Sequence, residues 1–182
     1  MAIQSRQASE MSKEIREQTN RLVAQLADPR GLVRLTARRS LVDMGAVAVP
    51  ALVEALQSHD RRLRWEAAKA LSEVCDPSAI TPLLDAMLDD DPEIRWLAAD
   101  GLAAIGWPAV RPLLRALIAE SDRTLFRLGA HHVLRTLEGR RADNFLRPVL
   151  RALESMEPSV EVPIAAEEVL YQLTLEDSAW AA

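Results

Sequence analysis

The feature that most limits the fold of this chain is a segment that recurs four times at nearly constant spacing. The copies read VRLTARRSLVDMG, LRWEAAKALSEVC, IRWLAADGLAAIG and FRLGAHHVLRTLE, and their arginines follow one another at intervals of 30, 31 and 32 residues. The aligned arginines are Arg34, Arg64, Arg95 and Arg127. A period near 30 residues is typical of solenoids, in which each unit stacks on the next.

A second recurring segment lies between the copies of the first. It reads VPALVEAL, TPLLDAML, RPLLRALI and RPVLRALE, with a proline near each start. Proline is tolerated in the first turn of a helix, because the N–H that it lacks has no partner there. Each unit is therefore predicted to hold two short helices. The apolar content comes mainly from alanine and leucine, which favour helices. We predict an all-α fold, an α-solenoid of about four helix pairs with terminal half-repeats.

Composition and charge exclude several classes of protein. Cys75 is the only cysteine, which rules out an internal disulfide and fits a reducing cytoplasm. The first residues lack the apolar core of a secretory signal, and the uncharged runs are far shorter than the ~18 apolar residues of a membrane span. The net charge is −5 and the small basic clusters have acidic neighbours, so no nucleic-acid-binding face is expected. We predict a cytoplasmic protein without membrane contacts.

The two ends of the array differ from its middle. Residues 10–27 share the pattern of the proline-bearing segments and are predicted to form a capping helix. The segment VPIAAEEVLYQL reads as a fifth, degenerate copy of the arginine-bearing helix, with Ala166, Leu170 and Leu173 on the core side. We expect one repeat domain over residues 10–177, a disordered N-terminus over residues 1–9 and a flexible tail over residues 178–182. Residues 138–144 are predicted to be a mobile loop.

The repeat pattern, Asp followed by Val/Ile-Arg-x-x-Ala-Ala-x-x-Leu, resembles HEAT repeats over about residues 20–175. It is most similar to the short repeats of phycobilisome-lyase-type proteins, and the combination of motifs looks like a bacterial HEAT family of unclear function. The resemblance implies the fold more strongly than any activity. Another HEAT enzyme, deoxyhypusine hydroxylase, uses His-Glu pairs as iron ligands, and this chain has no His-Glu dipeptide. No metal and no cofactor are predicted.

The helical positions of the aromatic residues suggest an apolar row. At about 100° per residue, Leu63, Ala67 and Leu71 form the core stripe of their helix, and Trp65 lies about 200° from Leu63. Glu66, Lys69 and Glu73 are predicted to face solvent. The helix over residues 94–105 is apolar on both faces, apart from Asp100. In HEAT arrays the second helix of each pair lines the concave surface, so the resemblance implies an inward-facing row of Leu35, Trp65, Trp96, Leu128 and Ile164.

Two interpretations of this row remain open. It can pack one repeat against the next, or it can bind a partner, since tryptophan is a frequent interface anchor. His131 and His132 are adjacent in a helix and diverge by about 100°, which favours hydrogen bonding or partner contact over a shared metal ion. The predicted partner-binding residues are Leu35, Trp65, Trp96, Leu97, Asp100, Leu128, His131 and His132.

The arginine column is predicted to be structural. Arg34, Arg64, Arg95 and Arg127 lie close in sequence to aspartates in the preceding turns, which suggests an Asp–Arg ladder from unit to unit. The alternative is anion binding, because the guanidinium group matches carboxylates and phosphates. The aspartates concerned are Asp28, Asp60, Asp89 and Asp91.

The chain shows no catalytic triad, phosphate-binding glycine loop or acid–base pair, so no catalytic residues are predicted. We therefore expect a protein-binding adaptor, scaffold or assembly factor that presents the concave row to a helix or peptide of another protein. The alternative is a bilin-lyase-type protein, or another chromophore-handling HEAT protein, whose row holds a flat apolar chromophore. A homodimer formed through the face of residues 94–105 is a third possibility.

Overall fold

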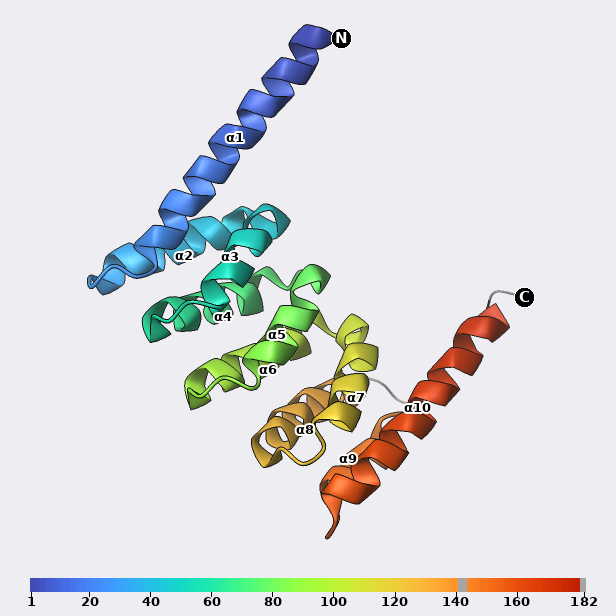
Figure 1. Ribbon diagram of the computed structural model, residues 1–182. Helices are drawn as coiled ribbons and strands as arrows, with labels where there is room; N and C mark the ends of the chain where they lie inside the picture. Colours follow the sequence, from blue (N-terminus) through green and yellow to red (C-terminus); the bar gives the residue numbers. More distant parts are fainter. Residues whose placement is uncertain (141–143, 181–182) are drawn as a thin grey trace.

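The computed structural model describes the backbone of residues 1–140 and 144–180, and most of their side chains. It contains ten α-helices and, within these residues, no strand (Figure 1), which confirms the predicted α-solenoid. The helices are α1 (Ala2–Gln25), α2 (Gly31–Asp43), α3 (Val49–Leu56), α4 (Arg61–Val74), α5 (Ile80–Ala86), α6 (Pro92–Ile105), α7 (Val110–Ala119), α8 (Thr124–Glu138), α9 (Arg147–Leu153) and α10 (Pro158–Trp180). Three short 3-10 turns, Gly45–Ala48, Pro77–Ala79 and Trp107–Ala109, lead into α3, α5 and α7.

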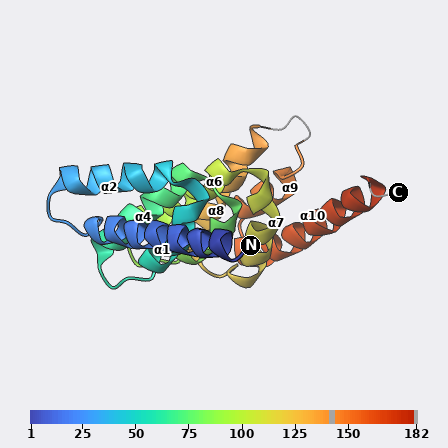
Figure 2. The same cartoon turned by 90° about the horizontal axis from the view of Figure 1, so that it is seen from above.

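The helices form two layers. We call α1, α3, α5 and α7 the first helices and α2, α4, α6 and α8, which carry the recurring arginines, the second helices. Figure 2 shows α1 and α7 on one side of the array and α2 and α6 on the other. Consecutive second helices pack against one another more extensively than consecutive first helices do. This closer spacing agrees with a position on the inner side of the curve.

The last helix pair is reversed relative to the others. Helix α10 packs against α7 and α9, and α9 contacts α8, so α10 lies beside the first helices (Figure 2). The Arg111 Nη2 of α7 donates to the Leu173 carbonyl of α10 over 2.7 Å, which fastens this arrangement. Ala166 and Leu173 are buried and Leu170 is partly buried, as predicted. Ile164 is exposed on α10, but the reversal removes that helix from the layer that carries Trp96.

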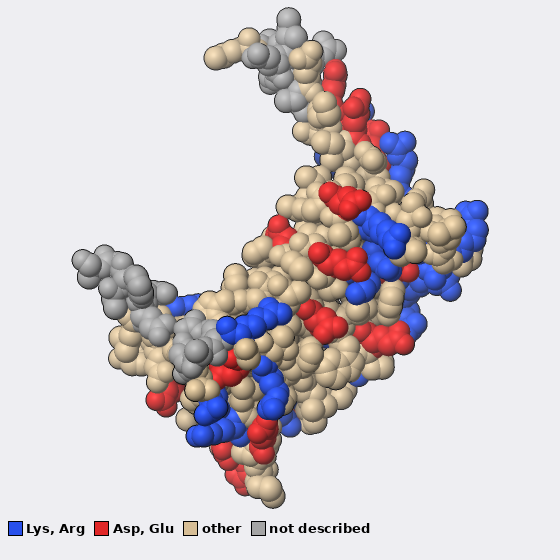
Figure 3. Space-filling model, turned by 180° about the vertical axis from the view of Figure 1, so that it is seen from behind, with Lys and Arg blue, Asp and Glu red and all other residues tan. Residues whose placement is uncertain are grey.

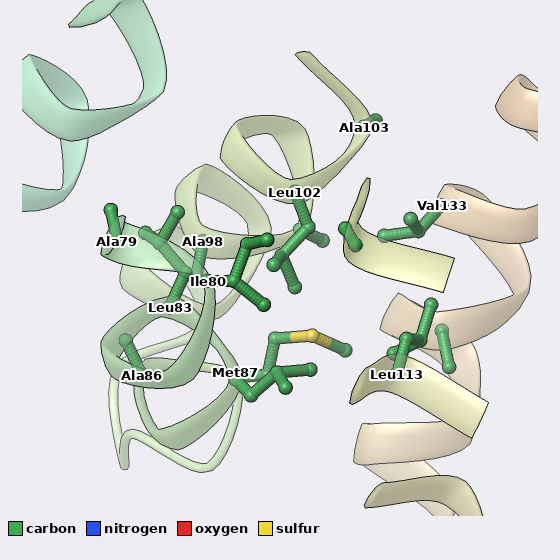
Figure 4. Packing of buried hydrophobic residues seen from close by; sticks show 14 of the residues in the cluster. Ala79, Ile80, Leu83, Ala86, Met87, Ala98, Leu102, Ala103, Leu113 and Val133 are labelled. Atoms are coloured by element: carbon green, nitrogen blue, oxygen red, sulfur yellow. The ribbon is translucent and has the colours of Figure 1, made fainter. Parts of the chain in front are cut away.

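A continuous apolar core runs between the layers. Figure 4 shows its centre, where Ile80 and Leu83 of α5 meet Leu102 of α6, and where the Met87 side chain reaches toward Leu113 of α7. These five side chains are at least nine-tenths buried. Because each unit supplies the same apolar positions, the core extends along the array instead of closing at one centre.

Two features of the backbone are typical of the second helices: a residue with positive φ after the helix, and a glycine where one helix lies close to the next. The second helices α2, α4 and α6 are followed by a residue with positive φ, at Gly45 (58°), Cys75 (55°) and Gly106 (87°). Cys75 thus occupies the place of a glycine, as its alignment predicts. Within α6, a Cβ on Gly101 would lie 3.3 Å from the Ser72 Cα of α4, so the missing side chain lets these two helices approach closely.

The terminal helices extend into the end segments for which disorder and flexibility were predicted. Helix α1 begins at Ala2, inside the segment expected to be disordered, because the first ten residues contain no glycine or proline and are mostly compatible with a helix. Helix α10 continues to Trp180, into the predicted tail over residues 178–182. Residues 181–182, and residues 141–143 of the predicted loop, lie outside the described part of the chain.

Within the residues that the structure describes, no single helix is both long and apolar enough to cross a membrane. The pair Pro92–Ile105 and Trp107–Ala119 meets the length and composition criteria together, but it is bent by 117° and contributes to the core described above.

Candidate functional site

Each recurring arginine holds the turn that precedes its own helix. The Nη1 of Arg95 donates to the carbonyls of Asp89 and Asp90 over 2.7 and 3.0 Å. Arg34 makes the same pair of bonds to Asp28 and Pro29, and Arg64 makes it to Ser58 and His59. Arg127 donates from Nη1 to the Ser121 carbonyl. All four arginines therefore share one interaction, in which Nη1 donates to a backbone carbonyl of the turn within the same unit.

Within the described part of the chain, only the first two arginines also reach the next unit. The Arg34 Nε donates to Glu66 over 2.9 Å, and Arg64 binds Asp89 through Nε over 2.8 Å and Nη2 over 3.2 Å. Burial alone would raise the pKa of Asp89, but hydrogen bonds, first among them those from Arg64, outweigh it and lower the pKa. Among the described residues, Arg95 and Arg127 contact no carboxylate. Of the predicted Asp–Arg contacts between units, the described residues contain the one between Arg64 and Asp89, while Arg34 reaches a glutamate instead.

The other aspartates of the predicted ladder have different partners. Asp28 binds the side chain of Arg30, whose hydrogen bonds lower the pKa of Asp28 to about 2. Asp60 accepts from the Arg62 backbone N–H at the start of α4. Asp91 accepts from two backbone N–H groups at the start of α6 and also binds Arg61. Carboxylates at helix N-termini satisfy donors that have no partner within the helix, and this competes with the ladder.

Glu66 corrects the predicted solvent face of α4. It is 4% exposed, and its two carboxylate oxygens accept from Arg34 over 2.9 Å and from Arg38 over 2.6 Å. Lys69 and Glu73, predicted to share that face, are more exposed and pair with each other over 3.4 Å. Because Arg34 and Arg38 belong to α2, Glu66 is an ionic contact between two successive second helices.

The predicted apolar row lies on successive second helices, but its members differ in exposure. Leu35 and Trp65 are partly buried, whereas Trp96 is 51% and Leu128 is 55% exposed. The Arg38 guanidinium lies 6.0 Å from the centre of the Trp65 ring, so α2 covers part of that tryptophan. Trp65 thus fits the packing interpretation, and the exposed surface is concentrated around Trp96 and Leu128.

Polar pairs flank this exposed part of the row. Trp96 meets the His132 ring edge-on, with centroids 5.2 Å apart. The His132 Nε2 lies 2.9 Å from Asp100, and the His131 Nε2 lies 2.9 Å from Glu154. Both histidines therefore have hydrogen-bonding partners, and no group of three or more side chains that could hold a metal ion occurs among the described residues.

Two hollows adjoin Leu128. The smaller, of about 50 Å³, is lined by Met87, Arg95, Trp96, Leu125, Leu128 and Gly129. The larger, of about 290 Å³, is lined by Thr124, Arg127, Leu128, His131, Leu153, Glu154 and Pro158. Leu125 was not predicted from the sequence, although it is 56% exposed. Leu97, which was predicted, is partly buried against the core. We call Trp96, Leu125 and Leu128 with these hollows the Trp96 surface.

The charges on the second-helix face are mixed. Figure 3 shows this face with basic and acidic side chains interspersed among uncharged surface, and no continuous basic area among its coloured residues. An extended polyanion therefore finds no uniform track there. Local contacts to a single carboxylate remain compatible with this distribution.

Comparisons with known proteins agree with this architecture. A family model for HEAT repeats matches residues 19–95 and 74–135. The bilin biosynthesis protein MpeU of Synechococcus sp. (strain WH8020) is 50% identical over 115 residues, which cover 62% of this chain and 38% of that protein. The complex of CpcE and CpcF of phycocyanin lyase from Nostoc sp. PCC7120 contains a chain with the same fold, with a TM-score of 0.59 and 23% sequence identity. The match covers 83% of this chain and 96% of that chain. Since the matched ranges span well over half of its length, the chain belongs to the HEAT-repeat family.

Proposed function

We propose that this chain handles a linear tetrapyrrole, in the manner of a bilin-lyase-type HEAT protein. The observation that carries the proposal is the 50% identity over 115 residues to a protein named for bilin biosynthesis. This favours the alternative drawn from the sequence over the adaptor as the main interpretation. Because the chain spans only 38% of that relative, the proposal concerns a binding step and not a complete reaction.

The Trp96 surface has the properties that such a ligand requires. A linear tetrapyrrole is a chain of flat, largely apolar rings, and Trp96, Leu125 and Leu128 present exposed apolar area in one region. A monomeric protein rarely leaves large apolar side chains grouped on its surface without a binding role. The hollows beside Leu128 offer places where ring substituents can be shielded from water.

Biliverdin is a suitable probe of this proposal. On mixing with the purified chain, we expect a shift of its long-wavelength absorbance band and quenching of tryptophan fluorescence. Trp96→Ser is expected to weaken binding about tenfold through loss of ring stacking, while changing the free energy of unfolding by only about 0.5 kcal/mol. Val47→Ser removes an equally exposed apolar side chain from another part of the array and should leave binding unchanged. No spectral change with the wild-type chain, or equal weakening by both variants, would refute the proposal.

We also propose that the chain binds another protein, as the adaptor interpretation predicts. Helix α10 carries an exposed apolar stripe at helical spacing, formed by Val160, Ile164, Tyr171 and Leu175. The similar fold from Nostoc was solved as a complex of two chains, which supports this second role. Copurification from the source cell with wild-type chain and with Ile164→Asp tests it. A partner retained by the wild type should be lost from the variant, and the same set of proteins on both chains would argue against this surface.

A further inference from the structure

Arg95 differs from Arg64 in one respect that concerns ligand binding. Both arginines clamp two backbone carbonyls of their own unit through Nη1. The opposite edge of Arg64, formed by Nε and Nη2, holds carboxylate oxygens of Asp89 and Asp90 in the next unit. The same edge of Arg95 has no hydrogen-bonding partner among the described residues. A guanidinium edge of this kind matches a carboxylate in size and geometry.

The repeat alignment explains why this edge is open. Asp89, which binds Arg64, precedes the first turn of α6, and the residue at the same place before α8 is Ser121. Glu66, which binds Arg34, lies in the first part of α4, and its counterpart in α8 is Gly129. The positions of Asp89 and Glu66 are therefore uncharged in the unit that follows Arg95. The counterpart of Asp90 is Asp122, which forms no hydrogen bond or ion pair with Arg95 in the described part of the chain.

The open edge is close to the exposed apolar part of the row. Arg95 lines the same hollow as Trp96, Leu125 and Leu128. Met87 also lines this hollow and is 1% exposed, and a Cβ on Gly129 would lie only 2.8 Å from the Met87 methyl. With glycine at position 129, Arg95 has no carboxylate where Arg34 has that of Glu66, and the Met87 methyl has the space that a Cβ would fill. A cation and an apolar surface lie side by side, with no acidic side chain in the lining.

We infer that Arg95 binds a carboxylate that is attached to an apolar ligand lying on the Trp96 surface. This inference rests on the proposed function, under which the carboxylate is a propionate of the linear tetrapyrrole. The Nε and Nη2 groups donate to the two carboxylate oxygens, while Nη1 stays on the carbonyls of Asp89 and Asp90. Arg95 thereby sets the orientation of the ligand and selects the acid over a neutral analogue.

Biliverdin and biliverdin dimethyl ester form a matched pair of probes, because only the first carries free propionates. The wild-type chain is expected to bind biliverdin about tenfold more tightly than the ester. Arg95→Gln should reduce biliverdin binding to the level of the ester and leave ester binding unchanged, which separates lost recognition from lost folding. Arg39→Gln, which removes an exposed positive charge from α2, should preserve the tenfold preference. Equal affinity of the wild-type chain for both probes would overturn the inference.

A second variant fills the open edge from within the chain. Ser121→Asp places a carboxylate where Asp89 stands relative to Arg64, so it should occupy Arg95 and abolish the preference for biliverdin over its ester. Ser121→Asn has nearly the same shape without the charge and should retain the preference. Retention of the preference in Ser121→Asp, with a chain that melts like the wild type, would contradict the assignment to Arg95.

A test without tetrapyrrole distinguishes the inference from the proposed function. Titrating hexanoate into the chain should shift the NMR signal of the Arg95 Nε–H group, and hexanamide should leave it in place. This shift together with no binding of either tetrapyrrole would refute the proposed function and keep the carboxylate site. Tetrapyrrole binding that ignores both the ester and Arg95→Gln would refute the inference and keep the function.

Discussion

Glu66→Ala is expected to lower the free energy of unfolding by about 3–5 kcal/mol, because it removes the shared anion of two arginines that are themselves largely buried. The side chains of Arg34 and Arg38 are 22% and 15% exposed, and Glu66 accepts from both. Without it, two positive charges remain close together with little water to solvate them. Denaturant unfolding of the purified chain, followed by circular dichroism, measures the change.

Glu73→Ala is the matched control for this prediction. Glu73 lies two turns further along α4, and its side chain is 35% exposed. It pairs with Lys69 over 3.4 Å and, at the longer distance of 3.8 Å, with the Arg38 Nε. Exposed ion pairs contribute about 0–1 kcal/mol, so this variant should unfold almost as the wild type does. If both variants lost similar small amounts of stability, Glu66 would not be the ionic contact that the structure indicates.

The repeat pattern was sufficient to predict the fold, for a physical reason. In a solenoid each unit contacts mainly its neighbours, so one local pattern of apolar residues specifies the whole core. The buried positions of Ala67, Leu71 and Leu102 follow from the helical period alone. The reversal of α10 does not follow from the helical period. The repeat pattern carries no signal for how α9 and α10 are placed relative to α7 and α8.

The same pattern predicted charged and aromatic positions less well. A helical wheel places a residue relative to the core of its own helix and ignores the helix alongside. Glu66 lies on the outer face of α4 by this measure, yet the arginines of α2 bury it. Trp65 and Trp96 occupy the same wheel position, and Arg38 partly covers only the first. Comparing each charged residue with the residue one repeat away would have found the Arg34–Glu66 contact.

At the candidate site, the sequence indicated only part of what the structure contains. The repeat alignment placed Trp96, Leu128 and Arg95 on one helix layer, and both packing and binding were proposed for the row. The exposure of Leu125 and the hollow beside Arg95 depend on how α8 packs against α6 and against the end of α5, where Gly129 meets Met87. Such contacts are set by side-chain volumes across two units, which no single repeat contains.

Deleting residues 1–27 is expected to abolish cooperative unfolding and cause aggregation. The deletion removes Leu26, which is fully buried, Thr19, which is 3% exposed, and the partly buried Leu22 and Val23. Their removal exposes the sides of α2 and α3 that α1 covers. Solenoids depend on contacts between neighbouring units, and an uncapped apolar end promotes association. Size-exclusion chromatography and thermal unfolding of the 28–182 chain measure the effect.

A shorter deletion separates the capping role from chain length. Residues 1–9 carry no repeat pattern, and removing them keeps every described contact of α1 from Ile15 onward. This shortened chain should therefore remain monodisperse and melt as the full chain does. Leu26→Ser in the full chain should give an intermediate result, with a loss of about 2–5 kcal/mol, because it leaves a cavity and a hydroxyl in the core. A 28–182 chain that stays monodisperse and melts in one sharp transition would show that α2 and α3 need no cap, and that α1 is only an appendage of the array.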